Sequence, residues 1–89
     1  MYSYTISNEA NQKLFEQTCN KLEELYPEIT FVKQIVDVDG SVVSVYSLDG
    51  REVVVENDYE IYAVYIDSQI ELTRWPGKPL KLSFLNTSE

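Results

Sequence analysis

The first third of the chain carries apolar residues at helical spacing. Between residues 7 and 26 they recur three, four or seven positions apart, with polar residues between them. This spacing predicts one amphipathic helix of about five turns. Ser7 is the predicted N-cap, Glu9 lies in the first turn, and Pro27 ends the helix because proline cannot continue one. Residues 1–6 are expected to form a short edge strand or an ordered tail.

After Pro27 the apolar residues alternate with a period of two, which is typical of β-strands. Strands are expected over residues 29–38, 42–48, 53–56, 59–66, 70–73 and 80–85. The turn signals between them are Asp39-Gly40 and Asp49-Gly50 for two-residue hairpins, Asn57-Asp58 for a weaker turn, and Pro76-Gly77 for a type II turn. The predicted fold is α+β: one N-terminal amphipathic helix packed on a five- to six-stranded antiparallel meander sheet, in a single domain of residues 1–89.

Two-residue turns also fix which strand positions face each other. The predicted pairs are Val36/Val43, Ile35/Ser44 and Lys33/Tyr46 in the first hairpin, and Leu48/Arg51, Tyr46/Val53 and Val45/Val54 in the second. One face then collects Phe31, Ile35, Val42, Tyr46, Leu48, Val53 and Val55, and the other collects Val32, Val36, Val38, Val43, Val45 and Val54, edged by Glu52, Glu56 and Asp58. Both faces of the predicted sheet are therefore substantially apolar.

Two apolar faces need more cover than one helix provides. Monomers seldom expose a contiguous apolar patch larger than a few hundred Å². We therefore expect a homodimer, joined sheet to sheet or edge to edge. The alternative is that the N-terminal segment and residues 67–79 fold across the second face.

Composition excludes several classes of protein. The single cysteine, Cys19, lies on the apolar side of the predicted helix, where a buried residue is expected. One cysteine allows no internal disulfide and favours the cytoplasm, the host cytoplasm if the protein is viral. No run approaches the 20 apolar residues that a membrane span needs.

No feature of the sequence predicts an enzyme, a cofactor or a metal site. The chain has no histidine, so the usual zinc sites and Ser-His or Cys-His nucleophiles are not expected. Asp37-Val38-Asp39-Gly40 is similar to the start of a calcium loop, but the twelfth position is Leu48 rather than glutamate. A hairpin turn is the better interpretation of that segment.

Acidic residues are concentrated in the predicted strands. Residues 34–73 hold nine acids and one base, a charge of −8 that equals the net charge of the whole chain. The candidate binding residues are Glu52, Glu56, Asp58 and Glu60, then Asp37, Asp39, Asp49, Asp67 and Glu71. Alternate strand residues lie ~6.6 Å apart on one face, on the order of the distance between neighbouring phosphates. The pattern predicts a surface that binds a basic nucleic-acid-binding protein and repels nucleic acid itself. The alternative is an acidic surface that serves solubility alone.

In size, charge and general organisation the chain resembles the small acidic DNA-mimic inhibitors that phages and mobile elements use against restriction or nuclease defences. The resemblance implies an inhibitor that occupies the nucleic-acid site of its target. Two other functions stay open: an immunity or antitoxin protein for one toxin, and an assembly component of a larger complex. Arg74, Trp75, Lys78 and Lys81 form a small basic patch that could stack a base, but we expect the tryptophan to close the end of the core.

Overall fold

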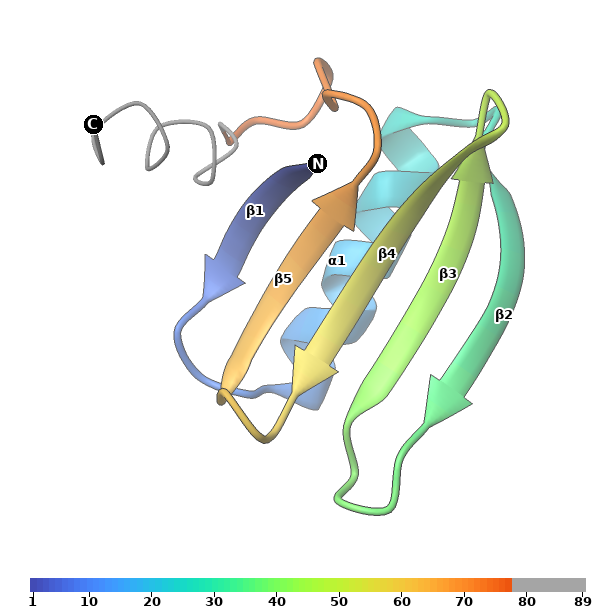
Figure 1. The fold of residues 1–89 in the computed structure, drawn as a ribbon. Coiled ribbons are helices and arrows are strands. Elements are labelled where there is room, and N and C mark those ends of the chain that lie inside the picture. Colours follow the sequence, from blue (N-terminus) through green and yellow to red (C-terminus); the bar gives the residue numbers. More distant parts are fainter. Residues whose placement is uncertain (78–89) are drawn as a thin grey trace.

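The computed structural model describes residues 1–77 as one helix on a five-stranded antiparallel sheet, which confirms the predicted α+β class. The elements are β1 (Tyr2–Ser7), α1 (Gln12–Leu25), β2 (Thr30–Val36), β3 (Val42–Leu48), β4 (Arg51–Asp58) and β5 (Ala63–Ser68). The strands lie in the order β1-β5-β4-β3-β2, with α1 behind the sheet in Figure 1. Strands β2 to β5 form the expected meander. The first strand precedes the helix and pairs with β5. Of the two structures predicted for residues 1–6, an edge strand or an ordered tail, the edge strand is observed.

The helix begins at Asn11 rather than at the predicted Ser7. The Asn11 side chain accepts a hydrogen bond from the Leu14 N–H at 3.0 Å. The Asn11 N–H in turn donates to the side-chain oxygen of Asn57 at 3.0 Å, which fixes the start of α1 above β4. Ser7 instead ends β1, because residues 8–10 are needed to carry the chain from the sheet edge to the helix.

The Asp49-Gly50 turn has the predicted type I′ form. Both residues have positive φ, 52° and 74°, which Asp and Gly tolerate better than other residues. All three predicted pairs across this hairpin are observed: Leu48 with Arg51, Tyr46 with Val53, and Val45 with Val54. The second hairpin register is therefore confirmed.

The Asp39-Gly40 prediction is wrong by one residue. The loop has three residues, and it is closed by hydrogen bonds from the Asp37 N–H to the Ser41 oxygen at 2.8 Å and from the Gly40 N–H to the Asp37 oxygen at 3.1 Å. The Asp39 side chain stabilises this longer loop by accepting from the Ser41 N–H at 2.9 Å, and Gly40 supplies a φ of 93°.

The extra loop residue changes the pairing of the first hairpin. The observed pairs are Val36/Val42, Ile35/Val43, Gln34/Ser44, Lys33/Val45 and Phe31/Tyr46, with a bulge between Phe31 and Lys33. A shift of one residue exchanges the faces of a strand. Ile35 therefore lies on the face away from the helix and Val36 on the helix side, the reverse of the prediction, whereas the bulge returns Phe31 to the helix side.

The later strands also differ from their predicted bounds. Residues 59–62 form a turn, with Tyr62 at a φ of 58°, so β5 starts at Ala63 and the predicted turn residues Asn57-Asp58 belong to β4. Residues 70–73 form no strand. The strand expected over residues 80–85 lies outside the described residues.

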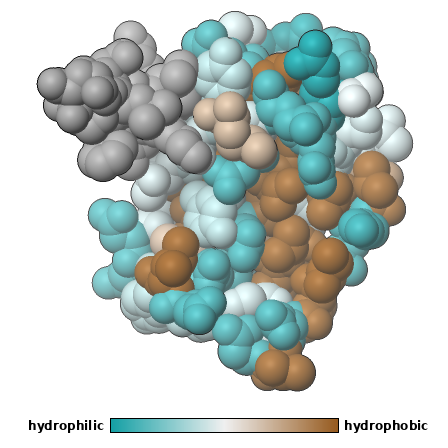
Figure 2. Space-filling view, in the orientation of Figure 1, coloured by the Kyte–Doolittle hydropathy of each residue, from teal (hydrophilic) through white to brown (hydrophobic). Residues whose placement is uncertain are grey.

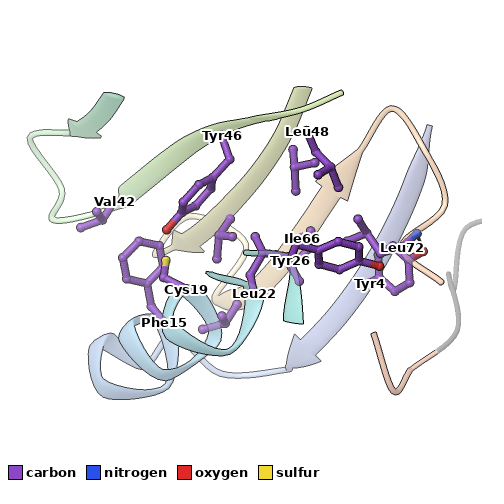
Figure 3. Packing of buried hydrophobic residues seen from close by; sticks show 13 residues of the cluster. Tyr4, Phe15, Cys19, Leu22, Tyr26, Val42, Tyr46, Leu48, Ile66 and Leu72 are labelled. Carbon is purple, nitrogen blue, oxygen red and sulfur yellow. Dashed lines mark hydrogen bonds between the residues drawn. The ribbon is translucent and has the colours of Figure 1, made fainter. Parts of the chain in front are cut away.

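The core lies between α1 and one face of the sheet (Figure 3). Its members are Tyr4, Phe15, Cys19, Leu22, Tyr26, Val42, Tyr46, Leu48, Val53, Val55, Val64, Ile66 and Leu72. Cys19 is buried, as predicted. Within residues 1–77, no helix is long and apolar enough to cross a membrane.

The segment after β5 packs at the end of this core, not on the second face. Its backbone is held by two core tyrosines: Tyr4 accepts from the Leu72 N–H at 2.7 Å and Tyr26 from the Arg74 N–H at 2.8 Å. Trp75 packs against the core, which confirms its predicted position. Among residues 1–77, the alternative cover for the second face is therefore not formed.

Replacing Asn57 tests the link between the helix start and the sheet. Asn57 is fully buried, and Asn57→Ala leaves the Asn11 N–H without its acceptor. We expect a loss of about 1–3 kcal/mol in the free energy of unfolding, measured by urea denaturation. The exposed helical Asn20→Ala is the control and should change it by less than about 0.5 kcal/mol. Equal effects of the two variants would contradict this role of Asn57.

Candidate functional site

The sheet face opposite α1, here called the open face, is the principal uncovered surface of the described chain. Strand alternation and the observed pairing place on it Lys33 and Ile35 of β2, Val43, Val45 and Ser47 of β3, Glu52, Val54, Glu56 and Asp58 of β4, and Ala63, Tyr65 and Asp67 of β5. Figure 2 shows this face, with an apolar strip running along it and hydrophilic side chains beside the strip. The surface therefore combines an apolar band with carboxylates.

Four of the nine predicted acids lie together on this face. Glu52, Glu56 and Asp58 follow one another along β4, and Asp67 lies on β5 opposite Val54. The Ser3 hydroxyl donates to Asp67 at 2.5 Å, and the Tyr65 hydroxyl donates to Asp58 at 3.4 Å. These two hydroxyl groups orient two of the carboxylates without neutralising them.

The carboxylates on the open face repel one another. Partial burial raises the pKa of Glu56, and the nearby charges of Asp58 and Asp67 raise it further, while the Tyr65 hydroxyl partly offsets the effect. The pKa of Tyr65 is raised as well, by burial and by Glu56. Within residues 1–77 the one ion pair joins Arg74 to Glu28 at 3.1 Å. No cation of the described chain is therefore paired with the open-face carboxylates.

The other five predicted acids lie at the two ends of the sheet. The loop between β2 and β3 carries Asp37 and Asp39, and the loop between β4 and β5 carries Glu60. The two loops contact each other, because the Tyr59 N–H donates to the Ser41 hydroxyl at 2.8 Å. Asp49 and Glu71 lie at the opposite end. The structure thus divides the predicted set into one group on the open face and two at the ends.

Two of the loop acids serve the backbone. Asp37 accepts from the Val38 N–H at 2.7 Å, and Asp39 accepts from the Ser41 N–H, a bond that lowers the pKa of Asp39. These bonds stabilise the loop between β2 and β3, the segment whose sequence is similar to the start of a calcium loop. Among residues 1–77, no three Asp, Glu, Cys or His side chains are grouped to hold a metal ion.

Sequence reasoning missed a hollow between α1 and β2. This space of about 330 Å³ is lined by Glu23, Pro27, Ile29, Phe31 and Tyr46. The Tyr46 hydroxyl donates to Glu23 at 2.7 Å. The Phe31 and Tyr46 rings pack edge to face, with their centres 5.7 Å apart. The sequence signal for β2 as a separate surface is that its apolar residues, Phe31, Val32, Ile35 and Val36, fall on both faces of the predicted strand.

The basic residue nearest the core does not extend the site. The Arg74 guanidinium pairs with Glu28 and lies 4.8 Å from the centre of the Tyr26 ring. The guanidinium charge therefore lies at the C-terminal end of α1, away from the open face. Lys78 and Lys81 lie outside the described residues.

Comparison with protein-family models, with curated proteins and with solved structures finds no match to this chain. The function is inferred from the surface alone.

Neutralising Glu56 tests the cost of holding its charge on the open face, to which partial burial contributes most and the neighbouring carboxylates contribute less. Its raised pKa means that the charged form is disfavoured in the folded state, so Glu56→Gln should stabilise the fold at pH 7 by up to about 1 kcal/mol. The gain should disappear as the pH falls below the ordinary pKa of glutamate, where the carboxyl is protonated in both states. Urea denaturation from pH 7 down to pH 4 measures this, with the exposed helical Glu24→Gln as control. A loss of stability at pH 7 would contradict a cost of holding this charge on the open face.

Proposed function

We propose that this protein is a non-enzymatic inhibitor whose open face binds a basic, nucleic-acid-handling protein at the place where nucleic acid would bind. The observation that supports the proposal is the group of four carboxylates on β4 and β5, which has no cationic partner among the described residues. A partner that supplies lysine or arginine side chains would relieve the repulsion between them. Direct binding of nucleic acid is disfavoured, because phosphates carry the same sign of charge.

The spacing of the carboxylates suits a mimic of phosphates. Glu56 and Asp58 lie two positions apart on β4, a rise of ~6.6 Å, on the order of the distance between neighbouring phosphates on one strand. The sheet supplies a rigid support for this spacing. Glu60 and the loop acids Asp37 and Asp39 extend the negative surface beyond the end of β4.

The apolar strip on the same face favours a second candidate. Val43, Val45 and Val54 lie beside the acids, and an apolar centre with a charged margin is typical of specific protein interfaces. An immunity or antitoxin protein for one toxin would use such a surface, with less dependence on salt. An assembly component would use the apolar surface with hardly any dependence on salt.

The proposal includes a cytoplasmic location for the protein. Cys19 is a free, buried thiol, and its pKa is raised by burial, so it stays in the unreactive form. A chain that carries one thiol of this kind suits a reducing cytoplasm, the host's if the protein is viral.

A triple variant on the open face tests the proposal. Glu52→Gln, Glu56→Gln and Asp58→Asn together remove three charges and keep side-chain size. Affinity for the partner should fall about tenfold, at ~0.5 kcal/mol for each exposed charge contact. The matched control removes three charges outside the open-face group, with Glu9→Gln in the connection before α1 and Glu16→Gln and Glu24→Gln on α1, and should bind as the natural protein does.

The partner for this test comes from affinity capture on the full chain, eluted with a salt gradient and challenged with duplex DNA. A nucleic-acid-binding protein that leaves at moderate salt, is displaced by DNA and is lost on the triple variant supports the proposal. A partner that the triple variant retains, or that DNA does not displace, contradicts it. Retention at high salt would then favour the immunity or assembly function.

A further inference from the structure

The outer edge of β2 is the most apolar exposed part of the described chain. All seven of its residues are exposed, and the apolar ones with the adjoining loop tip are Phe31 (53%), Val32 (53%), Ile35 (49%), Val36 (66%) and Val38 (104%). Among residues 1–77, no strand pairs with this edge. Proteins usually protect such an edge with charges, proline or a covering segment, because it is a template for another strand.

We infer that β2 pairs antiparallel with β2 of a second copy, about a two-fold axis at Ile35. The backbone of β2 is prepared for this contact. The Asp37 N–H bonds to Ser41, and hydrogen-bonded positions alternate along an antiparallel pair. Ile35 therefore bonds to β3, while the N–H and C=O groups of Gln34 and Val36 point outward.

An axis at Ile35 uses these outward groups and matches the side chains. Gln34 of one copy then pairs with Val36 of the other, through backbone hydrogen bonds, and the two Ile35 residues face each other. Lys33, the one charged residue of β2, falls opposite Asp37 of the other copy, twice by symmetry. An axis at Gln34 would instead place Lys33 opposite Ile35 and leave both charges unmatched.

The distribution of charge along the chain also favours β2 as the edge at which two copies pair. A chain of net charge −8 repels its own copy, and residues 37–73 contain all nine central acids. Residues 29–36 contain no acid and one lysine. The edge at β1 is uncharged too, but its side chains are mostly buried or half-buried, and a bulge interrupts its pairing between Thr5 and Ser7.

Pairing at β2 would join the two sheets into one of ten strands. The two-fold axis lies normal to the sheet, so both open faces lie on the same side. The acidic groups of the two copies would then form one longer surface. This dimer does not depend on the proposed partner of the open face.

A charge exchange tests the inference in the full-length protein. Lys33→Asp places carboxylates opposite each other, and Asp37→Lys places ammonium groups opposite each other, at both symmetric positions. Each should raise the dimer dissociation constant about tenfold, measured by sedimentation equilibrium. The double variant restores the attraction and should return the constant to within about threefold of the natural value. Lys21→Asp, the same charge change on the exposed side of α1, is the control and should leave dimerisation unchanged.

Amide hydrogen exchange gives a second readout that does not depend on variants. The Gln34 and Val36 amides should become protected as the protein concentration passes the dissociation constant. A monomer at all concentrations, a double variant no better than the singles, or protection of these amides in the monomer would overturn the inference. The open-face triple variant should still dimerise, so failure of the proposed function and failure of the dimer are distinguishable.

Discussion

One helix is too narrow to cover a sheet of five strands, and the rest of the structure depends on this mismatch. Strands ~4.8 Å apart give a sheet about 19 Å across between its outer strands, whereas a helix with its side chains is about 10 Å wide. In the described chain α1 packs mainly over β4, at the centre of the sheet. The margin at β1 is filled by Tyr4 and by the segment that carries Leu72. The margin at β2 has no such cover.

The uncovered surfaces differ in chemistry because charge and hydrophobicity are separated along the chain. The open face carries carboxylates beside its apolar strip, and Glu56 is held there against the repulsion of its neighbours. The β2 edge is apolar, with Lys33 as its one charge. One surface therefore suits a basic partner, and the other suits a strand of the same kind. A monomer that kept both in water would carry an electrostatic cost and an aggregation risk.

The sequence predicts the elements of this fold better than their registers. Asp49-Gly50 gives the predicted register because two residues with positive φ close the loop. Asp39-Gly40 carries the same signal, yet the Asp39 side chain bonds to the Ser41 N–H and favours a three-residue loop. That single bond moves Ile35 to the other face, and no sequence pattern distinguishes the two turns. The helix start was likewise displaced by a tertiary contact, between Asn11 and Asn57.

The candidate site was predictable to the same extent. Alternation along one strand places Glu52, Glu56 and Asp58 on a common face, and the structure confirms this arrangement. The position of Asp67 beside them depends on where β5 begins, which the turn at residues 59–62 determines. The separation of Asp49 and Glu71 from the group follows from the fold as a whole. Exposure of β2 could not be predicted, because it depends on the lateral position of α1.

Carboxyl footprinting tests most directly the claim that the open face is the binding surface. The full chain, alone and in complex with its captured partner, is labelled with a carbodiimide and a small amine, and the modified residues are located by mass spectrometry. We expect Glu52, Glu56, Asp58 and Asp67 to lose reactivity in the complex, while Glu16 and Glu24 on α1 keep theirs. Protection of the helix carboxylates with the open face still reactive would contradict it.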